Sequence, residues 1–448
     1  MGEFSRYRSA ANTAPRIFIA RLGQNMVGEH ALDRNEQQTK AIEEANPRGD
    51  RMIDFNPHAK PLQDDPYATY KKMRDEASVM HVPDLQFWAV SRFDDVQAAL
   101  RDPGKFSSRR SLESNDAYSN VPMIVIMDPP RHGELRALLS RAFTPRRVDE
   151  LAGRIREISI ELIDQFIEAG CCDLWRDFSS PLPTIVIAEL LGVPSEDREM
   201  FKEKSTALVQ SVGPGMDLDP AAIAASSNPV MELATYLAAV FVEKRKKPTD
   251  DLMGALLAAE VDGQRLDQAE LIGFALLLLI AGNETTTNLI SNAAVLLDQH
   301  PDQRSFLFED PTRIGIAVEE FLRFESPVQG LERIVTEDLT LGGETFQRGD
   351  KIFLMLGAAN RDERVIANPD QFDVRRTPNP HLAFGWGGHF CLGANLARME
   401  TRIAFEEIAK RLPDYYVSGP TERLYSGAFR GLLSIPIEFK SHEVPRTG

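Results

Sequence analysis

Ten consecutive residues, from Phe384 to Gly393, contain the most reactive side chain of the sequence. The segment reads FGWGGHFCLG and holds three glycines before a lone cysteine, Cys391, and a fourth glycine after it. Glycine adopts backbone conformations that other residues avoid, so the segment predicts a tight loop leading into a helix over 393–411. A helix N-terminus lowers the pKa of a thiol, and the thiolate is the form that binds a metal ion. One thiolate with no second cysteine nearby suits a single axial ligand to a planar metal cofactor, whereas zinc takes three or four protein ligands.

A second set of polar residues interrupts the longest apolar helix that the sequence predicts, over 265–299. Its middle carries Ala281, Gly282, Glu284 and Thr285. Glycine costs a helix about 1 kcal/mol relative to alanine, and a buried carboxylate needs a partner, so this combination indicates a functional site. The small residues leave room for water or a diatomic ligand, Thr285 can donate to its own i−4 carbonyl or into that space, and Glu284 can relay protons. A kinked helix with a solvated glutamate is the alternative.

Both motifs resemble those of the cytochrome P450 family. The order F-G-x-G-x-H-x-C-x-G is similar to the family's haem-binding loop, and Ala281 to Thr285 match its oxygen-activation motif. The resemblance runs from about residue 52 to the C-terminus. It implies haem b as the cofactor, held by the Cys391 thiolate beside Phe384 and Gly385. It also implies that Glu284 and Thr285 are the catalytic pair that supplies protons for oxygen activation.

Glu320 and Arg323 lie three residues apart, on one face of a helix predicted over 313–324. By itself such a pair is commonly a surface ion pair worth less than about 1 kcal/mol. The resemblance adds Arg376 and implies a buried glutamate and two arginines that brace the loop on the haem side. We therefore expect these three residues to form structural ion pairs without a catalytic role.

Four further residues are candidates to bind the two haem propionates. His132 and Arg136 are spaced i, i+4 and hence share a helix face, Arg333 follows the ion-pair helix, and His389 precedes Cys391 by two residues. The planar guanidinium of arginine suits a carboxylate. Each residue could singly be a solvated surface group, and their assignment to cofactor binding is implied by the P450 resemblance.

Composition excludes several classes of protein. The chain has 448 residues and a net charge of −16, which argues against general nucleic-acid binding. Three cysteines cannot form a disulfide framework, and this fits a reducing cytoplasm. The apolar run from Leu271 to Gly282 is only twelve residues long, too short to span a bilayer. We therefore expect a cytoplasmic protein without a membrane span.

Periodicity predicts one large, mainly α domain with small β sheets over residues 51–448, preceded by a polar extension over 1–50 that we expect to be disordered. The family's fold places the haem between the long central helix and the helix after the cysteine loop. Helices are predicted over 94–100, 131–143, 147–169, 183–192, 196–211, 229–246, 265–299, 313–324 and 393–411. Strands are predicted over 87–90, 339–341, 351–356 and 433–439.

The residues expected to contact substrate are apolar. They are Val125 from an irregular segment over 108–126, Phe274, Leu278 and Ala281 from the long helix, and Val328 and Leu432 from two turns. Such a lining suits a hydrophobic small molecule such as a terpenoid, fatty acid or steroid.

The chain shows no second domain or cysteine cluster for a flavin or an iron-sulfur centre, so electrons must come from a partner. Arginines crowd one short stretch and could dock an acidic ferredoxin, itself reduced by a ferredoxin reductase, although each could equally lie on a solvated helix face: Arg131, Arg136, Arg141, Arg146 and Arg147. The sequence thus predicts a haem-thiolate monooxygenase of the bacterial, ferredoxin-dependent type. A peroxide-driven haem enzyme and a haem-binding sensor without turnover are the alternatives.

Overall fold

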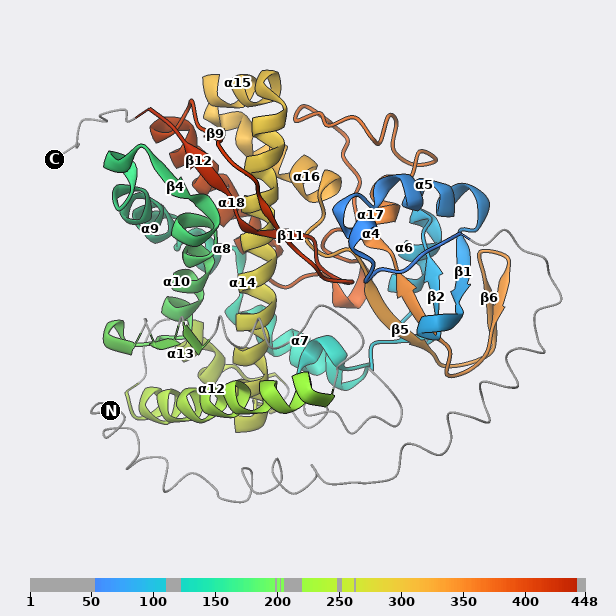
Figure 1. Ribbon diagram of the computed structural model, residues 1–448. Helices are drawn as coiled ribbons and strands as arrows, with labels where there is room; N and C mark the ends of the chain where they lie inside the picture. Colours follow the sequence, from blue (N-terminus) through green and yellow to red (C-terminus); the bar gives the residue numbers. More distant parts are fainter. Residues whose placement is uncertain are drawn as a thin grey trace.

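The computed structural model describes residues 53–109, 122–197, 200–201, 203–204, 220–247, 252–261 and 263–440. The extension over 1–50 and most of the helix predicted over 196–211 lie outside these ranges. Figure 1 shows two parts: a larger helical part around the long helix α14, and a smaller part built on a β sheet. The mainly α fold with small sheets that the sequence predicts is confirmed.

Helix α14 (Gln268–Gln299) runs through the middle of the helical part (Figure 1). It begins with a capping box, in which the Asp267 side chain accepts from the Glu270 backbone N–H and Glu270 returns the bond. It packs against α10 (Pro181–Leu190), α12 (Pro220–Lys246) and α18 (Ala394–Arg411). Within the described ranges it is the one helix long and apolar enough to cross a bilayer, but this is also expected of a helix so enclosed by others.

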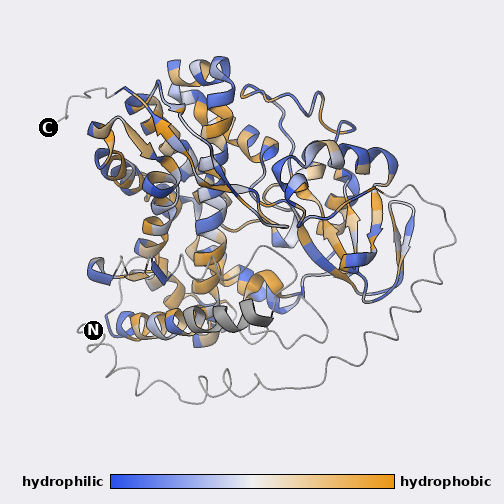
Figure 2. Cartoon of the chain, viewed as in Figure 1, coloured by the Kyte–Doolittle hydropathy of each residue, from blue (hydrophilic) through white to orange (hydrophobic). Residues whose placement is uncertain are grey.

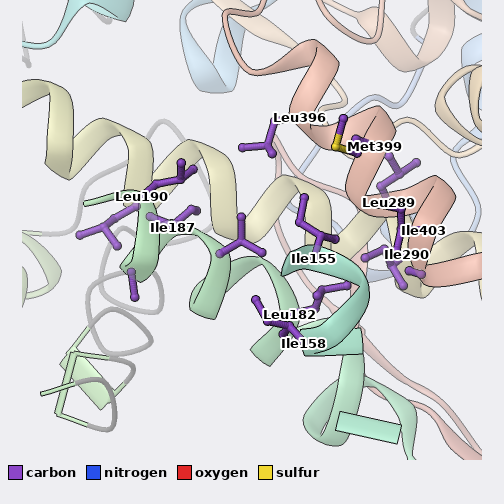
Figure 3. Packing of buried hydrophobic residues seen from close by; sticks show 14 of the residues in the cluster. Ile155, Ile158, Leu182, Ile187, Leu190, Leu289, Ile290, Leu396, Met399 and Ile403 are labelled. Atoms are coloured by element: carbon purple, nitrogen blue, oxygen red, sulfur yellow. The ribbon is translucent and has the colours of Figure 1, made fainter. Parts of the chain in front are cut away.

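The main hydrophobic core joins many helices, and four of them carry the residues labelled in Figure 3. Figure 3 shows Ile155 and Ile158 of α9 (Ala152–Asp164), Leu182 and Ile187 of α10, Leu289 and Ile290 of α14, and Leu396, Met399 and Ile403 of α18 packing together. Apolar residues three or four positions apart on each helix supply these contacts. The core therefore fixes α14 relative to α18, the two helices that flank the cysteine loop's cavity.

The five-stranded sheet has the order β1-β2-β8-β5-β3. Its strands are β1 (Val79–Val82), β2 (Phe87–Val90), β8 (Lys351–Leu354), β5 (Leu331–Val335) and β3 (Phe106–Ser107), and only the β2–β8 pair is parallel. A hairpin, β6 (Leu339–Leu341) with β7 (Glu344–Phe346), extends from it. In Figure 2 the sheet strands are largely hydrophobic, in keeping with their buried residues. Register across β5 and β8 places Arg333 opposite Ile352.

Two small sheets complete the β structure. One contains β4 (Cys171–Asp173), β12 (Pro436–Glu438) and β9 (Tyr416–Val417), and the other pairs β10 (Glu422–Leu424) with β11 (Gly431–Ser434). The strand predicted over 433–439 is therefore wrong as a single strand, because the chain changes sheets at Ile435.

The predicted helices agree in position with the observed ones, with three differences. The helix predicted over 147–169 is divided into α8 (Pro145–Asp149) and α9, and the positive φ of Gly170 ends the following turn. Helix α12 starts nine residues before its predicted beginning and continues through Pro229. Some helices were not predicted: α4 (Lys60–Asp64), α5 (Tyr67–Glu76), α13 (Leu252–Ala258), α15 (Pro301–Glu309) and α17 (Leu356–Ala359). The remaining helices are α6 (Phe93–Arg101), α7 (Arg131–Ala142) and α16 (Ile314–Phe324).

Candidate active site

The cysteine loop depends on glycine at two positions. Gly385 and Gly387 both have φ of +69°, a left-handed conformation that costs other residues energy. A Cβ atom on Gly387 would also lie 2.8 Å from the carbonyl oxygen of Leu100, so α6 can approach only a glycine. The Cys391 N–H donates to the Phe384 carbonyl at 2.9 Å and closes the loop. The tight loop predicted from the sequence is therefore present.

The electrostatic prediction for Cys391 is wrong in one respect. Helix α18 begins at Ala394, three residues after the thiol, and burial raises the pKa of Cys391. The Gly393 N–H, Arg136 and Arg398 act in the opposite direction and do not outweigh this desolvation. A coordinated metal ion deprotonates a thiol outright, so a thiolate at this position depends chiefly on the metal itself.

The loop opens onto a cavity of about 270 Å³ between α14 and α18, with α7 and β5 contributing to its wall. Thirteen residues singled out from the sequence line it: Val125, His132, Arg136, Phe274, Leu278, Ala281, Thr285, Val328, Arg333, Phe384, Gly385, His389 and Cys391. They come from segments up to 266 residues apart, Val125 to Cys391, which the fold brings to one place. The thiol, the buried cations and the apolar residues thus share a single chamber.

Two predicted site residues lie outside that lining. Leu432 was expected to contact substrate, but on β11 it is buried in the main core. Glu284 was expected to relay protons from bulk solvent, and its carboxylate accepts a hydrogen bond from Asn288 Nδ2 at 3.1 Å, four residues along α14. Burial raises the pKa of Glu284, and the Asn288 bond opposes that shift. Sequence analysis missed Asn288, although its i+4 spacing was a signal for this contact.

Thr285 and Gly282 refine the prediction made for the middle of α14. The Thr285 hydroxyl donates to the Ala281 carbonyl at 2.5 Å, one of the two bonds predicted for it. A Cβ atom on Gly282 would lie 2.9 Å from Ile187 Cδ1, so this glycine lets α10 approach closely. Ala281 and Gly282 both line the cavity, and Gly282 also serves packing.

The cations around the cavity lack carboxylate partners within the described part of the chain. Arg333 is 8% exposed, and its guanidinium donates to the neighbouring Glu332 carbonyl at 2.6 Å. Burial lowers the pKa of Arg333 to about 10 and also lowers the pKa of Arg136. His132 and His389 stack with ring centroids 3.9 Å apart, and burial followed by the neighbouring cations lowers the pKa of His389 to about 4. Buried guanidinium groups are normally paired, so this side of the cavity is suited to an anion.

Comparison with known proteins identifies the chain. The family model described as Cytochrome P450 matches residues 67–310 and 316–412. The protein belongs to the cytochrome P450 family. The enzymes of this family are monooxygenases that bind haem b, and both statements hold for this chain.

Three relatives illustrate the similarity. The vitamin D(3) 25-hydroxylase of Pseudonocardia autotrophica is 41% identical over 384 residues, which cover 83% of this chain and 93% of that protein. The structure of CYP109Q5 from Chondromyces apiculatus has a TM-score of 0.80 and 37% identity over 88% of this chain and all of its own. CYP109E1 from Bacillus megaterium, in complex with testosterone, has a TM-score of 0.77 and 36% identity over 84% of this chain and 99% of its own.

The donor set around the P450 cavity fits haem b. Cys391 provides one sulfur ligand, while Arg136 and Arg333 provide two guanidinium groups that form no ion pair with a carboxylate among the described residues. A propionate at each would remove an otherwise unpaired charge. The sequence analysis did not single out Ser108 as a site residue. Its hydroxyl lies 3.0 Å from His389 Nε2, and its N–H donates to Asp128 at 2.8 Å.

Ion pairs of Glu320 hold the segment that precedes the cysteine loop. Arg323 donates to both Glu320 oxygens, at 2.7 and 2.8 Å, and Arg376 Nε lies 3.3 Å from the same carboxylate. Arg323 also donates to the carbonyls of Asn360 and Pro369. These bonds connect α16 to the segment that precedes the cysteine loop.

The arginines predicted to dock a ferredoxin present less uncompensated positive charge than the sequence implies. Arg136 lines the cavity. Arg131 pairs with Glu134 and Glu270, and Arg146, whose side chain is 88% exposed, pairs with Glu150. Carboxylates thus offset part of the charge on this surface.

Glu400 is a titratable cavity residue that the sequence analysis missed. It lies on α18, is 1% exposed and has one oxygen, Oε2, without a hydrogen-bond partner. Burial alone raises its pKa to about 8, so the carboxyl is largely neutral at pH 7. No motif flagged it, because a glutamate inside an amphipathic helix is usually solvated.

Proposed function

We propose that this P450 hydroxylates a hydrophobic small molecule of the terpenoid, fatty acid or steroid class in the cytoplasm, with electrons from a ferredoxin and its reductase. The observation that carries the proposal is the largely apolar lining of the cavity that contains the cysteine loop. Val125, Phe274, Leu278 and Val328 contribute to this lining. A substrate held there would be bound by shape and apolar contact, with little demand for charged groups.

Relatives with steroid ligands or substrates support this substrate class. One of the proteins described above is named a vitamin D(3) 25-hydroxylase, and another was solved with testosterone. We extend that class to this chain because its own cavity is apolar. Arg146, whose side chain is 88% exposed, and the adjacent Arg147 place positive charge on the surface next to α7 and support an acidic electron donor.

Haem b, when bound through Cys391, supplies the iron at which dioxygen is split and one oxygen atom is transferred to the substrate. The reaction takes substrate, dioxygen, two electrons and two protons and yields alcohol and water. We assign the handling of protons to Glu284 and Thr285. Glu284 has a raised pKa and so retains a proton to higher pH than a solvated glutamate. Thr285 donates its own proton to the Ala281 carbonyl, and this leaves the lone pairs of its hydroxyl free to accept a hydrogen bond in the cavity.

We propose propionate binding for His132, Arg136, Arg333 and His389, and bracing of the loop for Glu320, Arg323 and Arg376. The support for the first group is the positive charge of Arg136 and Arg333, which has no carboxylate ion-pair partner in the described part of the chain, and the position of the two histidines beside these arginines. The support for the second group is its closed set of ion pairs. The two groups are therefore assigned different roles although both are rich in arginine.

Turnover with two oxidant supplies tests the proposal. Purified protein is incubated with testosterone or palmitoleic acid, and product is measured with a ferredoxin, ferredoxin reductase, NADPH and dioxygen, and separately with hydrogen peroxide. We expect product from the first mixture at a rate well above the second. Faster turnover with peroxide alone would replace the proposal by a peroxide-driven enzyme.

Replacing Thr285 by valine tests the proton assignment. Thr285→Val keeps the side-chain shape and removes the hydroxyl, so we expect product per NADPH to fall by roughly 100-fold, in the range of general acid catalysis. Thr287→Val is the matched control, since Thr287 lies on the same helix and bonds to Asn283, away from the cavity lining. Equal loss in both variants would contradict the assignment.

A further inference from the structure

Glu319 on α16 and Arg398 on α18 form an ion pair that the proposed reaction leaves without a role. Arg398 donates to both carboxylate oxygens of Glu319, from Nε at 2.7 Å and from Nη2 at 2.8 Å. A guanidinium that binds both oxygens of one carboxylate is held in a single orientation. The two side chains are half-buried, and an ion pair at this depth contributes little to stability.

This orientation places the Arg398 guanidinium against the cysteine loop. Its Cζ atom lies 4.5 Å from the centre of the Phe384 ring, within the range of a cation–π contact. Phe384 is the residue whose carbonyl accepts from the Cys391 N–H at 2.9 Å. Burial raises the pKa of Cys391, and the charge of Arg398 acts in the opposite direction. The cation is therefore fixed on the residue that closes the loop, and its field favours negative charge at the sulfur.

Glu319 is held by a second residue as well. His381, in the segment before the cysteine loop, has its Nε2 atom 3.0 Å from Glu319 Oε2. Burial raises the pKa of Glu319, but the hydrogen bonds from Arg398 and His381 bring it down to about 2. The carboxylate is therefore ionised at neutral pH. The adjacent Glu320 pairs with a different arginine, Arg323, so the two glutamates of α16 hold separate cations.

Charge at the cysteine loop affects the reduction of the haem iron. In that step the iron gains one electron and the donor loses one, no bond forms or breaks, and the haem site becomes more negative by one unit. A cation beside the loop stabilises the reduced form relative to the oxidised form, and a carboxylate does the reverse. The ion pair of Glu319 and Arg398 supplies one charge of each sign, with the cation on the Phe384 ring.

We propose that Arg398, positioned by Glu319, sets the reduction potential of the haem iron in this P450. Arg398 raises the potential through its charge at the Phe384 ring. Glu319 limits that rise, because it fixes the guanidinium and offsets part of its charge. The pair thus adjusts how readily the first electron is accepted from the proposed ferredoxin. This role rests on the proposed ligation of haem by Cys391.

Spectroscopic titration of the holoenzyme tests the proposal without turnover. The ratio of ferrous to ferric protein is measured at one fixed potential, with dithionite and a reference dye and without ferredoxin. We expect Arg398→Leu to lower this ratio and Glu319→Gln to raise it, each at least about threefold, as for one partly compensated charge about 10 Å away. Arg398→Lys keeps the charge without the planar fork and should restore part of the loss.

Arg402→Leu is the matched control. Arg402 lies one turn further along α18, pairs with Glu406, and has a side chain 36% exposed against 33% for Arg398. Its replacement should leave the ratio unchanged, because the charge removed is not on the cysteine loop.

Equal ratios in wild type and Arg398→Leu would overturn the proposal. Shifts of the same sign in Arg398→Leu and Glu319→Gln would also overturn it, since a general loosening of the loop gives that result. If Arg398→Leu does not retain haem, Glu319→Gln decides alone, and a ratio that falls or stays constant contradicts the proposal. The spectrum of the reduced wild type with carbon monoxide is recorded alongside, so that failure of ligation by Cys391 is recognised separately.

Discussion

Two groups of buried or half-buried arginines in this P450 are held in opposite ways. Around Glu320, the guanidinium groups of Arg323 and Arg376 meet a carboxylate and backbone carbonyls, so their charge is satisfied by the protein. Around the cavity, Arg136 and Arg333 have no carboxylate in the described chain, and burial lowers the pKa of both. The charges of the first group are compensated without a ligand, whereas those of the second group are compensated only when an anion binds. Unpaired buried charge therefore distinguishes a binding site from a structural brace made of the same residue type.

The largest loss of stability is expected from breaking the ion pairs around Glu320. Glu320→Gln would leave Arg323 and Arg376 buried beside a neutral amide, and breaking a buried pair costs about 3–5 kcal/mol. We expect a marked fall in the urea concentration at which the holoenzyme unfolds, or loss of folded protein. Glu309→Gln, at an exposed position at the end of α15, is the control and should unfold with the wild type. Unchanged unfolding of Glu320→Gln would show that this group does not brace the fold.

The two groups also differ in how far the sequence predicted them. Glu320 and Arg323 lie on one helix turn, so their contact follows from spacing, whereas Arg376 joins them only through the long segment after α17. The four propionate candidates come from α7, β5 and the cysteine loop, and the residues alone placed only His132 and Arg136 together, on one helix face. The grouping of all four was implied by family resemblance, and the structure adds that neither Arg136 nor Arg333 forms an ion pair with a carboxylate among the described residues.

Errors in the sequence analysis have a common cause. Leu432 was placed in the substrate pocket because an apolar turn residue suits either a pocket or a core, and only tertiary packing assigns it to the core. The thiol pKa was judged from a helix end alone, although burial of Cys391 acts in the opposite direction and is larger. Glu400 was missed because burial cannot be read from one residue type. In each case the deciding quantity is desolvation, which depends on the whole fold.

A moderate increase in the rate of haem dissociation is expected when one of the two cavity arginines is replaced. Arg333→Leu removes an unpaired buried charge from the protein and a propionate partner from the haem. A charge-assisted hydrogen bond contributes about 1.5–3 kcal/mol, so haem should dissociate at least about tenfold faster, as measured by transfer to apomyoglobin. Arg348→Leu is the control, since Arg348 is exposed on the turn before β8. Equal rates of haem loss in wild type and Arg333→Leu would remove the distinction between the two groups.

The most gradual effect concerns Glu400, a buried acid that is neither paired nor left charged. Its pKa rises from 4.5 in a solvated state to about 8 in the fold. A raised folded-state pKa contributes stability that is present below pH 4.5 and is lost as the pH rises towards 8. Relative to Glu400→Gln, the wild type should therefore lose up to about 1.4 kcal/mol of unfolding free energy per pH unit across this window. A difference between the two proteins that is constant with pH would show that Glu400 ionises normally.

The most direct measurement is the absorption spectrum of the reduced protein with carbon monoxide, in wild type and in Cys391→Ala. The wild type should show the strongly red-shifted Soret band of a thiolate-bound haem, and the variant should lack it. Such a result would establish that the cavity with the unpaired arginines is a haem-thiolate site. A wild type without that band, or a variant that keeps it, would contradict the assignment of Cys391 and the function built on it.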